Sequence, residues 1–123
     1  MPRSILEASR QHPAIRDHIA NWQADIVHNV QAASQSHAVL VVGMAQNPFC
    51  RRARQALKDA GQPHQYLEYG SYLSQWRRRS ALKMWSGWPT FPMVFVRGML
   101  VGGTADLRKL IDSGELKRLL GEA

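Results

Sequence analysis

The chain has one cysteine, Cys50, so its thiol chemistry depends on how that side chain is placed. Cys50 follows Asn47-Pro48-Phe49 and is surrounded in sequence by arginines, Arg51, Arg52 and Arg54. A thiolate attacks disulfides, and both a helix N-terminus and nearby cations stabilise it. Cys50 could therefore be reactive. The alternative is a small apolar residue buried beneath the start of the helix, which is how free cysteine usually behaves.

A single cysteine excludes an intramolecular disulfide and an all-cysteine metal site within one chain, so redox chemistry would need an external thiol. The histidines do not change this, because no pair stands at a metal-ligand spacing supported by cysteine or carboxylates. They are His12, His18, His28, His37 and His64. We expect no mononuclear metal site.

The formal charge of +7 is concentrated in one part of the chain. Residues 51–83 contain eight Lys or Arg against Asp59 and Glu68, whereas residues 1–46 contain three of each sign. Such a patch attracts anions, from a peptide carboxylate to RNA, or is simply a solvated basic face. Tryptophans at 76, 85 and 88 interleave with the basic residues, but their spacing is more typical of core anchors, so nucleic acid is not an expected partner.

A strand and a helix must position Cys50. Residues 38–43 form a continuous run rich in β-branched residues, which predicts a central strand covered on both faces. Asn47 is a favoured N-cap and Pro48 a favoured first helical residue, so a helix should follow and stop at Gly61. Its expected inward face is Phe49, Ala53, Ala56, Leu57 and Ala60.

The remaining pattern completes an α/β fold. Residues 64–69 alternate like a second strand, residues 71–85 read as a helix, and residues 91–96 and 99–101 form a hairpin around Arg97-Gly98. Thr104 should cap a last helix through Ile111, extended by residues 115–120. This order predicts a mixed four-stranded sheet flanked by helices.

Before the first strand, Pro13 should open one amphipathic helix ending near Ala33. Its apolar stripe is Ile15, Ile19, Trp22, Ile26 and Val30. The stripe packs on the following domain or, alternatively, forms a partner-binding face through which a homodimer could assemble. The length fits one domain, with residues 1–36 as an N-terminal helical extension and residues 37–123 as the main domain.

No apolar stretch approaches the length needed to cross a bilayer, so no membrane association is expected. The first residues are interrupted by Arg10, His12 and Pro13 and lack the apolar core of a secretory signal. We therefore expect a cytoplasmic protein.

Three motifs resemble the glutaredoxin family in order and spacing. They are Asn47-Pro48-Phe49-Cys50 after the first strand, Trp88-Pro89-Thr90-Phe91-Pro92 before the third, and Val101-Gly102-Gly103 before the last helix. The resemblance runs from about Ala38 to Leu120. It implies a thioredoxin-like (glutaredoxin) fold, glutathione as cofactor, and glutathione or a thiol/disulfide protein as partner.

The resemblance also assigns roles to individual residues. The family's first cysteine position is occupied by Asn47, whose amide can cap the helix but cannot attack sulfur, and Cys50 matches the second position. Pro92 should follow a cis peptide bond, and Phe91 should pair through its backbone with the cysteinyl part of glutathione. Arg79 should grip the glycine carboxylate.

The other end of glutathione should lie near the last helix. The backbone amides of Gly103 and Thr104 should receive the γ-glutamyl carboxylate. An aspartate normally follows to bind the amino group, but Ala105 stands there, so either Asp106 substitutes for it or the contact is missing. The family's lysine three residues before the first cysteine is Met44. The expected glutathione-binding residues are Asn47, Phe49, Arg79, Phe91, Pro92, Gly103, Thr104 and Asp106.

These departures predict a retained fold with altered chemistry. The leading hypothesis is a glutaredoxin-related protein that binds glutathione or a similar thiol, with weak or atypical thiol–disulfide oxidoreductase activity through Cys50 as the catalytic residue. The alternative is a catalytically silent binding or adaptor module. A glutathione-assisted iron–sulfur cluster is not expected, because Asn47 removes the protein ligand.

Overall fold

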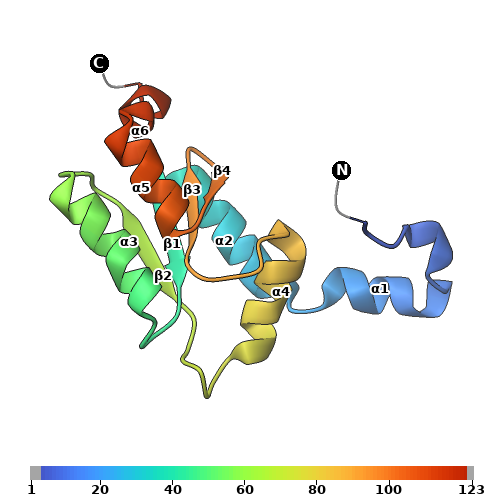
Figure 1. Ribbon diagram of the computed structural model, residues 1–123. Helices are drawn as coiled ribbons and strands as arrows, with labels where there is room; N and C mark the ends of the chain where they lie inside the picture. The colour runs from blue at the N-terminus through green and yellow to red at the C-terminus, as the bar shows by residue number, and fades with distance from the viewer. Residues whose placement is uncertain (1–3, 122–123) are drawn as a thin grey trace.

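The computed structural model describes residues 4–121 and has the predicted mixed sheet (Figure 1). The elements are η1 (Ala8–Arg10), α1 (Pro13–Asn21), α2 (Ala24–Ser36), β1 (Val39–Gly43), α3 (Pro48–Asp59), β2 (Gln65–Glu68), α4 (Trp76–Ser86), β3 (Met93–Val96), β4 (Met99–Gly102), α5 (Thr104–Asp112) and α6 (Glu115–Leu119). The strand order is β2-β1-β3-β4. None of the helices within residues 4–121 is long and apolar enough to span a membrane.

Strand β1 is the centre of the sheet. It pairs in parallel with β2, through Leu40 and Gln65, and antiparallel with β3, through Val42 and Met93. All five of its residues are buried, as the continuous apolar run predicts for a strand covered on both faces. Its carboxyl end therefore leads directly from the core to the start of α3.

Alternation along the strands divides the core between the two faces of the sheet. Leu40 and Val42 pack with Ile26 and Val30 of α2 and with α4. Val39 and Val41 pack instead with α3, α5 and α6. Since successive strand residues point to opposite faces, one short strand anchors both helical layers.

Helix α3 begins as predicted, but a different residue of its first turn faces the sheet. The Asn47 side chain caps the helix and Pro48 is its first residue. Phe49, expected to face the sheet, is 53% exposed, whereas Cys50 is buried. Ala53 and Leu57 are buried as expected, while Ala60 is exposed. The thiol thus occupies the inward position that the pattern assigned to the aromatic ring.

The predicted single N-terminal helix is wrong, because the chain forms two helices. Gln23 has a φ of 50°, which breaks the helix between α1 and α2. Ile26 and Val30 of α2 are buried, but Ile15 and Ile19 of α1 are exposed. In Figure 1, α1 extends away from the sheet and its helices. The change of direction at Gln23 separates the two halves of the apolar stripe.

The helix predicted from Ser71 begins later, at Trp76. The Ser71 N–H donates to Ser74 Oγ at 3.0 Å, and the Ser71 hydroxyl accepts from the Leu73 N–H at 3.3 Å. Serine side chains that bond nearby backbone compete with helical hydrogen bonds in this way. Leu73 is consequently exposed, and a turn replaces the first part of the predicted helix.

Candidate functional site

The starts of α3 and α5 and the loop before β3 meet at one end of the sheet. Pairing of Val42 with Met93 places the Phe91–Pro92 loop beside the end of β1, where α3 begins. The Thr104 hydroxyl donates to the Phe49 carbonyl at 2.6 Å and so joins α5 to α3. A Cβ added at Gly103 would lie 3.6 Å from the Pro92 carbonyl oxygen. The structure therefore brings these predicted site segments together.

Asn47 occupies the electrostatically favourable position at the start of α3. Its Oδ1 accepts hydrogen bonds from the N–H groups of Phe49 at 2.9 Å and Cys50 at 3.1 Å. These N–H groups have no partner within the helix, and they form the positive end of its dipole. The side chain thus uses the donors that would otherwise stabilise an anion at this position.

Cys50 is packed tightly against the end of β1. The residue is 1% exposed, and a Cβ added at Gly43 would lie 2.8 Å from its Sγ and 3.0 Å from the Tyr66 hydroxyl. Only a residue without a side chain leaves room for the sulfur at this distance. The absence of a side chain at Gly43 therefore leaves the space that the buried Cys50 thiol occupies.

The environment of Cys50 favours the neutral thiol. Burial raises the pKa of Cys50 above its ordinary value, and the Glu68 carboxylate adds to this effect. A hydrogen bond with the backbone of Met44 and the charge of Arg54 lower the pKa, but burial outweighs them. The structure thus supports the buried-residue interpretation of Cys50 over the reactive one.

This pKa shift predicts a loss of stability at alkaline pH. Above the ordinary thiol pKa of 9.0 the unfolded chain releases the Cys50 proton while the folded chain keeps it, so stability is complete below that pH and falls above it. Denaturant unfolding from neutral pH to pH ~10 should show the decrease, and Cys50→Ala should reduce its slope. An identical slope in both proteins would contradict the assignment. Tyr66 and Tyr69, whose pKa values are also raised by burial, contribute at higher pH.

A small cavity of about 360 Å³ lies next to Cys50 on the β2 side. Within it, the Tyr66 hydroxyl donates to Glu68 at 3.1 Å, and the Arg54 guanidinium lies 4.0 Å from the centre of the Tyr66 ring. We did not predict this polar group from sequence. Its one sequence signal is Gly43, at the end of a strand of otherwise β-branched and leucine residues.

One guanidinium nitrogen of Arg79 is bonded within the protein. The residue is 7% exposed, and its Nη1 donates to the Tyr69 carbonyl at 2.9 Å and to the Ser74 carbonyl. These carbonyl groups belong to the loop between β2 and α4. In this structure the guanidinium holds the protein's own loop, where we expected it to face a ligand carboxylate.

The start of α5 also differs from expectation. Gly103, not Thr104, is the N-cap, and the Gly103 N–H donates to the Asp106 carboxylate at 3.1 Å. Gly102 has a φ of 117°, and a Cβ there would lie 2.5 Å from Asp106 Oδ2. The Gly103 N–H is thus bonded to Asp106 Oδ2 where we expected it to receive the γ-glutamyl carboxylate of glutathione.

Three polar groups beside Pro92 have no partner in the described part of the chain. The indole N–H of Trp88 is buried without a hydrogen bond, 3.7 Å from the position of a Cβ at Gly103. No residue between 4 and 121 bonds the backbone N–H or carbonyl of Phe91, and the Phe91–Pro92 peptide bond is cis. Buried unpaired polar groups are uncommon, so this is a place where a ligand could supply hydrogen bonds. The Trp88 indole is a site feature that the sequence reasoning missed.

Among residues 4–121, no three His, Cys, Asp or Glu side chains form a group that could hold a metal ion.

Comparison with known proteins identifies the family. The glutaredoxin family model matches residues 39–101. A glutaredoxin-like protein of Dictyostelium discoideum is 41% identical over 102 residues, which is 83% of each chain. A probable monothiol glutaredoxin of Legionella pneumophila is 34% identical over 80 residues, covering 65% of this chain and 86% of that protein.

Solved structures agree with the fold. Oxidized glutaredoxin 2 from Chlamydomonas reinhardtii aligns with a TM-score of 0.69 and 26% identity over 80% of this chain and 94% of its own. A buckwheat glutaredoxin–glutathione complex aligns with a TM-score of 0.71 over 82% and 92% of the two chains, and at 21% identity it supports the fold alone. The predicted thioredoxin-like fold is confirmed, and the chain belongs to the glutaredoxin family.

Proposed function

We propose that this protein binds glutathione or a similar thiol along Phe91, and that thiol–disulfide exchange through Cys50 is slow. The observation that carries the binding half is the unpaired backbone of Phe91 next to the start of α3. A peptide that lies along Phe91 as an added strand segment would pair with its N–H and carbonyl. The buried Trp88 N–H offers a further donor for a ligand oxygen.

The ends of the ligand would be held less firmly than the resemblance implies. Arg79 Nη1 donates to loop carbonyls and Asp106 Oδ2 caps α5, so each group is already partly engaged within the protein. A glutathione molecule would have to compete with these internal bonds for its carboxylates and amino group. Competition from these internal bonds should lower the affinity of the protein for glutathione. We therefore keep other small thiols among the proposed ligands.

Exchange through Cys50 would proceed by attack of its thiolate on a glutathione mixed disulfide. The bond from Cys50 Sγ to the glutathione sulfur would form as the substrate sulfur leaves as a thiolate and takes a proton. A second glutathione would then attack the new disulfide, releasing oxidised glutathione and the Cys50 thiol. Burial of Cys50 and its raised pKa oppose the first step. The same observations favour a catalytically silent binding module as the second candidate.

The test of binding is a titration of reduced glutathione into the isotope-labelled protein, followed by amide and indole chemical shifts. We expect shifts at Phe91, Gly103, Thr104 and the Trp88 indole, and the same shifts in Cys50→Ala, because binding does not require the thiol. Absence of shifts at these positions would refute the binding proposal.

A separate assay tests exchange. Glutathione-dependent reduction of a mixed disulfide should be slow in the unsubstituted protein and absent in Cys50→Ser. No measurable activity in the unsubstituted protein would leave the silent module as the function.

Three finer expectations stay predictions beside this proposal. A homodimer through the N-terminal extension, residues 1–36, would cover the exposed Ile15 and Ile19. A cytoplasmic location and the division between residues 1–36 and 37–123 likewise rest on the sequence alone. An iron–sulfur cluster is not part of the proposal, because Asn47 supplies no sulfur ligand.

A further inference from the structure

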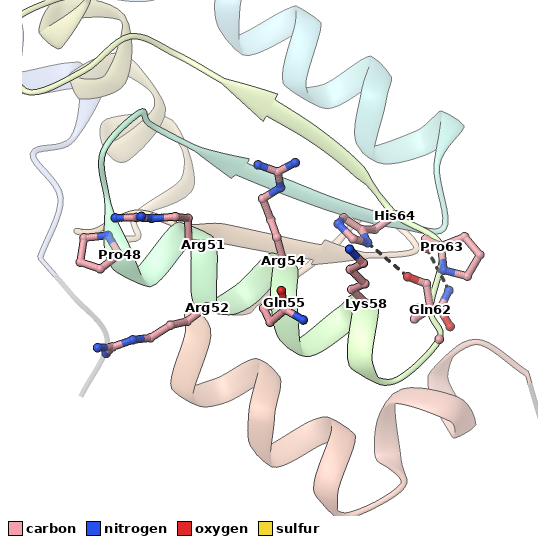
Figure 2. A pocket seen from close by; sticks show the side chains of 10 residues that line it. Pro48, Arg51, Arg52, Arg54, Gln55, Lys58, Gln62, Pro63 and His64 are labelled. Atoms are coloured by element: carbon pink, nitrogen blue, oxygen red, sulfur yellow. Dashed lines mark hydrogen bonds between the residues drawn. The ribbon is translucent and has the colours of Figure 1, made fainter.

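A second hollow of the surface, of about 870 Å³, runs along the outer side of α3 and the loop to β2 (Figure 2). It is lined by Pro48, Arg51, Arg52, Arg54, Gln55, Lys58, Gly61, Gln62, Pro63 and His64. We refer to these ten residues as the α3 groove. Its lining does not include Phe91, Trp88 or Gly103, but Arg51 and Arg54 also line the cavity beside Cys50.

The α3 groove is strongly basic. Four of its lining residues are Arg or Lys, and none is Asp or Glu. The two ion pairs within residues 4–121, Arg78 with Asp25 and Arg118 with Glu115, lie outside it. Asp59 of the same helix accepts a hydrogen bond from Gln55 at 2.7 Å. Glu68 lines the cavity beside Cys50 together with Arg51 and Arg54 and offsets part of their charge, but no carboxylate lines the groove itself.

The cations are arranged in a row. Arg51, Arg54 and Lys58 are three and four residues apart, which places them on neighbouring turns of one helix side and spreads them over about 10 Å. Figure 2 shows Lys58 beside His64, which comes from the loop to β2, and Arg52 pointing to the other side of α3. In an extended peptide, side chains on one side recur about every 7 Å. A short extended segment could thus place two carboxylates within reach of these cations.

We propose that the α3 groove binds an acidic segment of a partner protein. Charge complementarity selects an anion, and arginine can bind a carboxylate through two parallel hydrogen bonds. Single-stranded nucleic acid is the less suitable anion, because its binding sites add aromatic rings on which bases stack. No Phe, Tyr or Trp lines the groove, and the nearby Tyr66 ring is already covered by Arg54 at 4.0 Å. This inference goes beyond the proposed thiol binding and does not depend on it.

The test is a fluorescence-anisotropy titration of the full chain with a labelled peptide of alternating glutamate and serine. The double variant Arg51→Gln/Lys58→Gln should weaken binding about tenfold at low salt. Both residues are exposed, so the fold should be kept. The matched control Lys109→Gln/Lys117→Gln removes the same charge from exposed positions of α5 and α6 and should leave the affinity within about twofold.

Several outcomes would overturn the proposal. Equal weakening in both double variants would mean that peptide binding depends only on the net charge of the protein. Lack of binding by the unsubstituted protein, or no effect of Arg51→Gln/Lys58→Gln, would refute the site. Tighter binding of an oligothymidylate of equal charge, lost in the same variant, would assign the groove to nucleic acid. The glutathione-induced shift at Phe91 should be unchanged in Arg51→Gln/Lys58→Gln, which keeps this test separate from that of thiol binding.

Discussion

Asn47→Cys should increase glutathione-dependent disulfide reduction about 100-fold, because it would place a thiol where the helix stabilises negative charge. The N–H groups of Phe49 and Cys50, which now bond Asn47 Oδ1 at 2.9 and 3.1 Å, would face the new sulfur. A thiol at a helix N-terminus has a lower pKa than a buried thiol, so a much larger fraction of it is thiolate at neutral pH. The measurement is the steady-state rate with a glutathione mixed disulfide.

The control for this gain is Asn47→Cys/Cys50→Ala, which has only the new thiol. It should keep most of the increased rate, because the mixed-disulfide reaction needs one nucleophile, and Asn47→Ser should show no gain. Loss of the amide cap should cost about 1 kcal/mol of stability in both proteins that carry Asn47→Cys, whereas the serine of Asn47→Ser can still cap the helix. A folded Asn47→Cys/Cys50→Ala protein with no gain would show that the rest of the site no longer supports exchange.

Arg79→Leu should lower the free energy of unfolding by about 3 kcal/mol. The substitution removes a charged donor from the carbonyl groups of Tyr69 and Ser74, and a hydrogen bond to a charged group contributes about 1.5–3 kcal/mol. Denaturant unfolding measures the change. The matched control is Arg77→Leu, an exposed arginine on the same helix, for which we expect a change within about 0.5 kcal/mol.

The same pair of variants distinguishes a structural role from a ligand-binding role for Arg79. A structural role predicts loss of stability and increased mobility of the loop before α4, whatever the glutathione concentration. Unchanged stability of Arg79→Leu together with weaker glutathione binding would instead support the ligand-binding role of Arg79 that the family resemblance implies.

Local patterns were sufficient to predict the elements that build the site. The β-branched run before Gly43 and the Asn47-Pro48 pair depend only on neighbouring residues, and both elements form where expected. The hairpin turn at Arg97-Gly98 also forms, with positive φ values of 50° and 81° that suit a two-residue turn. The order of the elements predicts the mixed sheet that joins them, and the family resemblance implies the same fold.

Tertiary partners explain what could not be predicted. Whether Arg79 meets a ligand or the Tyr69 carbonyl depends on how the loop before α4 folds back, which no local pattern encodes. Asp106 is three residues after Gly103 and can therefore cap its own helix. The burial of Cys50 depends on the space that Gly43 leaves on another element. In each case an internal partner competes with the expected ligand.

The close packing of Cys50 against Gly43 also bears on oxidative damage. Peroxide attacks thiolates that solvent can reach, converting them first to sulfenic acid and then irreversibly to sulfinic and sulfonic acids. Only 1% of Cys50 is exposed and burial raises its pKa, so little of its sulfur is in the thiolate form that peroxide attacks. The burial that opposes thiolate formation at Cys50 should therefore also preserve its thiol under peroxide stress that oxidises accessible cysteines.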